Sequence, residues 1–122
     1  MKIIEAINQI DSLKHNTYSQ ANKLEWLSRL DAMVKKHIID THEGEEVTFA
    51  GYGDLTDPQT ELLVPAPYDE MYLRWMEAQI DYHNGEYDKY NNAIDMFDTA
   101  YQGYHNYYNR THKPKGEKIK YF

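Results

Sequence analysis

The chain has 122 residues, no cysteine and a formal net charge of −7. This length fits one small domain, and the lack of cysteine excludes disulfide frameworks, thiolate zinc sites and cysteine nucleophiles. No run approaches 18 apolar residues, and the opening MKIIEAINQID carries acids inside its apolar pattern. We therefore expect a soluble protein that is neither exported nor inserted in a membrane.

The charges are unevenly distributed. Between His37 and Asn109 acids are frequent and the basic residues are Arg74 and Lys89, whereas the tail RTHKPKGEKIKYF is rich in lysine. An acidic body repels nucleic-acid phosphates, which argues against sequence-specific DNA binding by the body. For the basic tail, the acidic surface of another protein subunit is the favoured target and nucleic acid is the alternative.

Apolar residues at helical spacing predict two helices in the first third of the chain. The first runs from about Lys2 to Leu13, and the second follows Ser19, a suitable N-cap, and reaches about Ile39. Trp26 lies off the apolar stripe of the second helix, so it either widens the buried face or is offered to a partner.

A long segment, Asp40 to Gln59, contains three glycines and no lysine or arginine, and it is predicted to be a loop. A short strand at Val47 to Phe49 is possible, with Glu61 to Val64 either its partner or simply extended. We treat residues 40–64 as a loop insertion in the domain. Loops this long are usually functional or disordered.

Pro65 and Pro67 predict that a third helix begins at about Pro67 and ends at Asn84-Gly85, where glycine permits a left-handed turn. A three-four alternation of apolar residues then predicts a fourth helix from Tyr87 to about Arg110. The short break folds these helices into an antiparallel αα-hairpin. The predicted fold is all-α, a bundle of about four helices over residues 1–112 followed by an extended basic arm over residues 113–122.

The chain has twelve tyrosines and three phenylalanines. Tyrosines at helical spacing are most often a buried helix face, but this number exceeds what one small core needs. Tyrosine and tryptophan favour interfaces because they combine apolar area with a hydrogen-bonding tip. The residues that we expect a neighbouring subunit to cover are Trp26, Tyr82, Tyr104, Tyr107 and Tyr108.

The sequence has only weak motifs for catalysis, metal binding or phosphate binding. No glutamate precedes a histidine by three residues, as di-metal bundles require. His37 and His42 with Asp40 and Glu43 could hold a metal, but solvated helix-end residues explain them more simply. GYGD lacks the lysine of a phosphate-binding loop. We predict no catalytic residues, no metal and no cofactor, so an enzyme, such as a small metal-dependent hydrolase, is the weaker class.

The segment ELLVPAPYDEMYLRWMEAQIDYHNGEYDKYNNAIDMFDTAYQGYHNYYNRTH, with IDTHEGEE upstream, resembles small head-tail connector (adaptor) proteins of prophages and long-tailed phages of Gram-positive bacteria. The resemblance spans nearly the whole chain. It implies a helical subunit of a twelve-membered ring beneath the portal in the virion neck, present in the host cytoplasm during assembly. Its implied partners are the portal protein, other copies of itself and tail-side neck proteins, with DNA passing through without specific binding and no membrane contact.

Position within such a subunit assigns two candidate sites. A portal-docking arm would comprise Lys113, Lys115, Lys118, Ile119, Lys120, Tyr121 and Phe122. A channel or tail-side loop would present Glu43, Glu45, Glu46, Asp54 and Asp57. The alternative is another acidic, non-enzymatic phage protein, either a tail-completion factor or a DNA-mimicking inhibitor, and a mimic would need its acids in paired rows.

Overall fold

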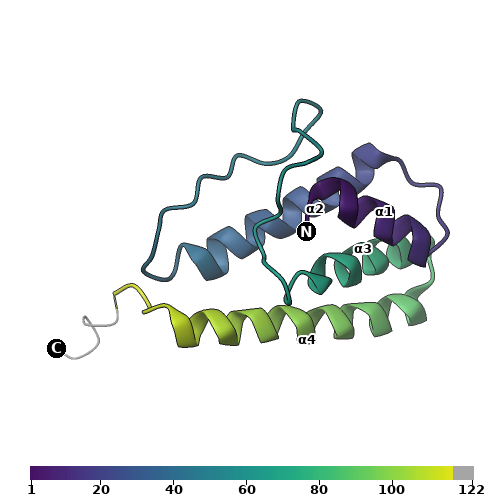
Figure 1. Ribbon diagram of the computed structural model, residues 1–122. Helices are drawn as coiled ribbons and strands as arrows, with labels where there is room; N and C mark the ends of the chain where they lie inside the picture. The colour runs from purple at the N-terminus through teal and green to yellow at the C-terminus, as the bar shows by residue number, and fades with distance from the viewer. Residues whose placement is uncertain (117–122) are drawn as a thin grey trace.

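The computed structural model describes residues 1–116 and confirms the all-α prediction, with four α-helices and no strand in that range. The helices are α1 (Ile3–Leu13), α2 (Gln20–Val34), α3 (Glu70–His83) and α4 (Tyr87–Thr111), and a wider π-helical turn, η1 (Lys35–Ile39), continues α2. Figure 1 shows α3 and α4 side by side and antiparallel. Because α3 also contacts α1 and α2, it lies at the centre of the bundle.

The predicted start of the second helix is confirmed. Ser19 Oγ accepts a hydrogen bond from the backbone nitrogen of Asn22 at 3.1 Å, which satisfies one free donor of the first turn. The helical path reaches Ile39, as predicted, but its last turn is wider. There the Asp40 nitrogen donates to the Lys35 oxygen at 2.8 Å, five residues earlier in the chain.

The Asn84-Gly85 turn closes the predicted hairpin. Gly85 has a φ of 73°, and its nitrogen donates to the oxygen of Tyr82 at 3.0 Å. The nitrogen of Glu86 donates to the oxygen of Asp81 at 2.9 Å, so two carbonyls at the end of α3 are satisfied. Glycine is favoured here because other residues resist this left-handed backbone conformation.

The third helix begins later than predicted. Residues 65–69 form tight turns, in which Tyr68 nitrogen donates to Pro65 oxygen at 3.0 Å and Tyr72 nitrogen donates to Asp69 oxygen at 3.1 Å. Regular α-helix starts at Glu70 rather than at Pro67. The proline pattern therefore placed the start of the helix too early, because tight turns also suit these prolines.

The core lies between the four helices. α1 contributes an isoleucine stripe, α2 and η1 contribute leucine, valine and isoleucine, and α3 contributes methionine, tyrosine and isoleucine. Its most enclosed members include Ile10, Leu27, Leu30, Val34, Ile38, Met71, Tyr72, Met76 and Ile80. α4 adds Phe97 and Tyr104 from one face, and its other face stays open to solvent.

Two lysines tie the connection between α1 and α2 to the bundle. Lys23 is buried, and its Nζ donates to Asp11 Oδ1 at 2.6 Å and to the Tyr18 oxygen at 2.9 Å. Lys14 Nζ lies 2.7 Å from Oδ1 of the buried Asp81 on α3. Such pairs hold the helix ends in place, because removing one partner leaves a buried charge unpaired.

The possible β-hairpin in the loop is wrong. Glu61 forms an isolated antiparallel bridge with Lys2, next to bonds from Ile3 nitrogen to Thr60 oxygen at 3.0 Å and from Leu62 nitrogen to Met1 oxygen at 2.9 Å. The extended residues before α1 therefore supply the partner that Val47 to Phe49 was expected to supply. The loop is also longer than predicted, covering residues 40–69.

The first residues of the predicted arm lie against the start of the loop. Glu43 nitrogen donates to Lys113 oxygen at 2.7 Å, and Lys115 nitrogen donates to Thr41 oxygen at 2.9 Å. Residues 113–115 are thus paired with the start of the loop, and residues 115 and 116 form a turn. The remaining assigned residues, Lys118 to Phe122, lie outside the described part of the chain.

Replacement of Phe97 by alanine should test the register of the hairpin. Phe97 is 4% exposed and packs on Trp75 with ring centroids 5.0 Å apart. Its truncation should lower the free energy of unfolding by about 3 to 5 kcal/mol in urea titrations followed by circular dichroism. Met96→Ala is the matched control, since Met96 is 47% exposed and should cost less than about 1 kcal/mol. Equal losses in the two variants would contradict the register.

Candidate functional site

A buried carboxylate on α2 fixes the long loop to the bundle. Asp31 is fully buried and accepts hydrogen bonds from the hydroxyls of Tyr52 and Tyr72, the latter at 2.6 Å, and from the backbone nitrogen of Leu63 at 3.2 Å. Tyr72 Oη also accepts from the nitrogen of Val64 at 2.8 Å. One side chain therefore joins both halves of the loop to α2 and α3.

Burial raises the pKa of the Asp31 carboxyl above its ordinary value of 3.8, and the three hydrogen bonds that it accepts oppose this rise without cancelling it. Burial, followed by the charge of Asp31, also raises the pKa of the hydroxyls of Tyr52 and Tyr72. Both tyrosines therefore stay protonated near neutral pH and remain donors to Asp31. We call Asp31, Tyr52, Tyr72 and Leu63 the loop clamp.

The loop acids assigned to a channel or tail-side surface fall into two separate groups. Glu45 and Glu46 line a polar pocket with Lys35, Asp40 and Lys115, close to the root of the arm. Glu43 is next to them, since its backbone bonds to Lys113. The other two assigned acids are Asp54 and Asp57, which lie on the far part of the loop. The structure thus does not bring all five acids together.

The far part of the loop lies over α1 and α2. Asp54 borders a groove of about 300 Å³ whose apolar lining includes Ile4, Ile7 and Leu24. Asp57 Oδ1 accepts from the nitrogen of Gln59 at 2.9 Å, which tightens the turn. Leu55 between the two acids is fully exposed. This loop tip, residues 53–58, offers both negative charge and apolar area.

The root of the arm is organised around His42. Its ring is buried, with Nδ1 2.6 Å from the oxygen of Ile38 and Nε2 2.6 Å from Asn109 Oδ1. Tyr108 packs its ring edge-on against His42, with centroids 5.0 Å apart. His42 therefore connects η1, the start of the loop and the end of α4. Sequence reasoning treated it as a solvated helix-end residue, and its sequence position alone does not distinguish these environments.

Close packing continues next to His42. The rings of Tyr108 and His112 stack with centroids 3.8 Å apart, and a Cβ placed on Gly44 would lie 3.3 Å from Cδ2 of His112. Glycine therefore lets the loop pass close to the end of α4. The exposed cations Arg110, Lys113 and Lys115 follow at this end, and none has an ion-pair partner among residues 1–116. We call these three residues the basic end.

Two of the five aromatic residues expected at a subunit interface are buried within the chain. Trp26 is 5% exposed and packs between Tyr18 and His83, with ring centroids 5.6 and 5.7 Å away. Tyr104 is 3% exposed and packs on Tyr68, with centroids 5.6 Å apart. The chain itself covers both, which contradicts the expectation for Trp26 and Tyr104. The turns around Tyr68 cover Tyr104, and helical periodicity could not predict where that segment lies.

The other three expected aromatic residues keep exposed surface. Tyr82 is 52% exposed, whereas Tyr107 and Tyr108 are half-buried. Tyr82 forms a cluster with Tyr87 and Tyr90 at the hairpin turn, with centroids 6.1 and 5.5 Å away. Tyr87, the first residue of the apolar alternation that predicted α4, is more exposed still, at 62%. Its place in the first turn of α4, beyond the bundle, explains the difference.

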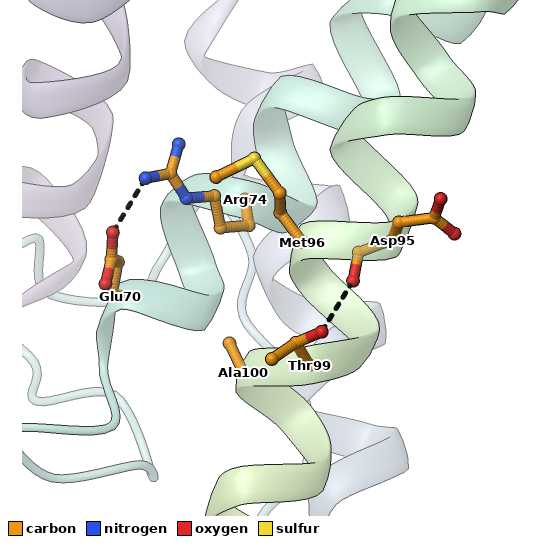
Figure 2. A pocket seen from close by; sticks show the side chains of 6 residues that line it. All are labelled: Glu70, Arg74, Asp95, Met96, Thr99 and Ala100. Carbon is orange, nitrogen blue, oxygen red and sulfur yellow. Dashed lines mark hydrogen bonds and ion pairs between the residues drawn. The ribbon is translucent and has the colours of Figure 1, made fainter.

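A groove follows the open side of the α3–α4 hairpin. It has a volume of about 410 Å³ and is lined by Glu70 and Arg74 of α3 and by Asp95, Met96, Thr99 and Ala100 of α4. Figure 2 shows Arg74 and Met96 reaching toward each other across it, whereas the carboxylate of Asp95 points away from α3. Arg74 is held by ion pairs to Glu70 at 2.8 Å and to Glu77 at 3.5 Å. Sequence reasoning did not find this groove, because it depends on how the two helices are spaced.

Within residues 1–116 no group of three or more histidine, aspartate or glutamate side chains is placed to hold a metal ion. In the same range no helix combines the length and apolar character needed to cross a bilayer. The described part of the chain is a small all-α bundle. No family model, curated protein or solved structure matches it.

Replacement of Asp31 by asparagine should change how stability depends on pH. Because the folded-state pKa of Asp31 lies above the ordinary value, the folded protein holds this proton more tightly than the unfolded chain. Stability from Asp31 is therefore greatest at low pH and falls as the pH rises through the folded-state pKa.

Urea titrations of both proteins between about pH 4 and pH 7 check this sign, since the ordinary carboxyl pKa lies at the lower limit. The wild type should lose stability relative to Asp31→Asn as the pH rises. Asp54→Asn, in the exposed part of the loop, is the matched control and should leave the trend unchanged. A wild-type advantage that grows with pH would contradict the raised pKa.

Proposed function

We propose that this protein is a head-tail connector (adaptor), a structural subunit of the phage neck that joins the portal of a DNA-filled head to the tail. The observation that carries the proposal is the separation of charge along the subunit. Unpaired cations gather at the basic end, where the arm begins, whereas Asp54 and Asp57 lie on the far part of the loop and further acids lie on the outer face of α4. The resemblance of residues 61–112 to connector proteins supports the same role.

The basic end is proposed to face the portal. Arg110, Lys113 and Lys115 are exposed there, and the sequence continues with Lys118 and Lys120. Positive charge steers a segment toward an acidic partner, and the aromatic pair Tyr121 and Phe122 would anchor it. The backbone pairing of Lys113 and Lys115 with the loop fixes where the first residues of the arm lie on the bundle.

The acidic surfaces are proposed to suit a DNA channel and the tail side of the neck. Negative side chains repel phosphates, so DNA can slide past without specific binding. Asp54 and Asp57 at the loop tip are separate from the basic end and are the better candidates for this surface. Glu43, Glu45 and Glu46 lie near the root of the arm, where Lys35 and Lys115 offset their charge.

Within the connector proposal, copies of this chain form a ring, twelve-membered in the virion, between the portal protein and tail-side neck proteins. A DNA-mimicking inhibitor is less well supported. On the outer face of α4 the acids Asp88, Asp95 and Asp98 alternate with uncharged Asn91, Gln102 and Asn106, and they do not form paired rows. A tail-completion factor would share the surfaces and differ in its partner.

Two truncations should distinguish the contribution of the root of the arm to portal binding from that of residues 117–122. Deletion of residues 117–122 retains the bridge between Lys113–Lys115 and the loop, whereas deletion of residues 113–122 removes it. Both should keep the helical circular dichroism of the full chain. Binding to immobilised cognate portal rings should be lost in the longer deletion and strongly weakened in the shorter one, because each lost lysine removes an attractive charge.

A scrambled arm that keeps the composition of residues 117–122 serves as the control for non-specific charge. Undiminished portal binding by the longer deletion would reject the docking role of the arm. If the natural and the scrambled arm both bind the portal at low salt and lose binding equally as the salt concentration rises, charge attraction alone holds the arm. The aromatic residues would then not act as anchors.

A further inference from the structure

The Asn84-Gly85 turn has the sequence at which asparagine loses its side-chain amide most readily. In this reaction, deamidation, the backbone nitrogen of the following residue attacks the side-chain amide carbon, Cγ. Glycine allows the closest approach because it has no Cβ to shield its nitrogen. Asn84 is the only asparagine of the chain that precedes a glycine, and both residues are exposed. The chemistry of the side chains therefore favours deamidation here, and the geometry of the turn determines how fast it proceeds.

The folded turn holds the two reacting groups apart. Asn84 has a φ of −77° and a ψ of −7°, which place the nitrogen of Gly85 beside the nitrogen of Asn84 and away from its Cβ. Ring closure onto Cγ needs the Gly85 nitrogen next to Cβ, so the chain must first rotate about the Cα–C bond of Asn84. That rotation breaks the hydrogen bonds from Gly85 nitrogen to Tyr82 oxygen and from Glu86 nitrogen to Asp81 oxygen. Deamidation therefore requires the turn to open locally.

A tyrosine from another part of the chain holds the Asn84 side chain. Tyr18 lies in the connection between α1 and α2, and its hydroxyl donates to Asn84 Oδ1 at 2.6 Å. Its ring packs against Trp26 and His83, with centroids 5.6 and 6.0 Å away, so the hydroxyl is fixed in position. A donor to Oδ1 also polarises Cγ, but this helps the attack only when the Gly85 nitrogen is near. In the folded turn that nitrogen is turned away, so the bond protects the amide.

We propose that Asn84 is a spontaneous deamidation site and that the Tyr18 hydroxyl slows the reaction by holding the Asn84 side chain in place. When the turn opens, the Gly85 nitrogen loses its proton and forms a bond to Cγ of Asn84. The Cγ–Nδ2 bond breaks, and Nδ2 leaves as ammonia with that proton. Water then opens the cyclic imide at either carbonyl and leaves aspartate or isoaspartate at position 84. The reaction needs no oxidant or reductant, and the inference does not depend on the connector function.

The two products change the hairpin differently. Aspartate keeps an acceptor for the Tyr18 hydroxyl and adds a negative charge to a turn that already contains Asp81 and Glu86. Isoaspartate adds the same charge, and it also lengthens the backbone because the main chain then runs through the side-chain carbon. The nitrogens of Gly85 and Glu86 no longer reach their acceptors on α3. Isoaspartate should therefore loosen the packing of α4 on α3, whereas aspartate should leave the turn intact.

Ageing of the purified full chain in mildly alkaline buffer tests the site, since the attacking nitrogen must lose a proton. Peptide mass spectrometry measures conversion at Asn84 in the wild type and in Tyr18→Phe, each folded and in concentrated urea. In urea the two proteins should react equally fast, and faster than when folded. Folded Tyr18→Phe should react about three- to tenfold faster than the folded wild type, the factor that one lost hydrogen bond supplies.

Tyr87→Phe is the matched control, since it removes an exposed tyrosine hydroxyl at the same turn and leaves the bond to Asn84 Oδ1 in place. It should react at the wild-type rate, and circular dichroism should confirm that both variants are folded. A folded wild type that reacts as fast as the chain in urea would overturn the proposed protection. Folded Tyr18→Phe that reacts no faster than the wild type would reject the role of Tyr18.

Asn84→Asp separates the added charge from the lengthened backbone. The isoaspartate form, isolated from aged protein by chromatography, should unfold at a lower urea concentration than Asn84→Asp, which should unfold close to the wild type. Equal midpoints for the isoaspartate form and Asn84→Asp would contradict the predicted loosening of the hairpin. A lack of isoaspartate at position 84 in protein aged in urea would overturn the site itself.

Discussion

The course of the long loop depends on a buried carboxylate, that of Asp31, which has no cation partner among residues 1–116. Asp31 lies on the side of α2 that faces the core, where burial disfavours the charged form of its carboxyl. Hydrogen bonds from Tyr52, Leu63 and Tyr72 offset part of this cost. This arrangement is costly to break because the loss of Asp31 would leave the buried hydroxyl of Tyr72 without its acceptor. The long loop has no helix or strand of its own between Ile39 and Glu70, and the clamp gives it a fixed course.

The clamp also determines what the subunit can present. By holding Tyr52 and Leu63, it leaves the loop tip and its acids on the side of α1 and α2, away from the basic end. At the other end, His42 fixes the start of the loop to Asn109, and the loop backbone pairs with the root of the arm. The loop clamp thus keeps the loop tip, with Asp54 and Asp57, apart from the basic end, whereas the contacts of His42 and Glu43 hold the start of the loop against it.

Sequence patterns predicted the elements that local chemistry determines. The Ser19 cap, the Asn84-Gly85 turn and the helix that begins at Tyr87 each follow from short-range rules, and the structure confirms them. The loop clamp was not predictable in this way. Asp31 follows the buried Leu30 in an amphipathic helix, and without the positions of Tyr52 and Tyr72 an aspartate there cannot be told from a solvated one.

The candidate surfaces were predicted less completely for the same reason. Trp26 and Tyr104 were assigned to an interface, but Tyr18, His83 and Tyr68 cover them from segments distant in sequence. The hairpin groove depends on how α3 and α4 are spaced, which periodicity alone does not supply. The distribution of charged residues, by contrast, can be predicted from the sequence. In the structure Arg110, Lys113 and Lys115 lie together at the basic end, and Asp54 and Asp57 lie at the loop tip.

A connector with separated charges should bind in one orientation. Electron microscopy of cognate portal rings mixed with the full chain measures this most directly. The account predicts twelvefold extra density at the tail-side end of the portal, with the end of α4 and the basic end against the portal and the acidic loop tip away from it. Protein that stays free of the portal, or density with the loop tip against the portal, would contradict it.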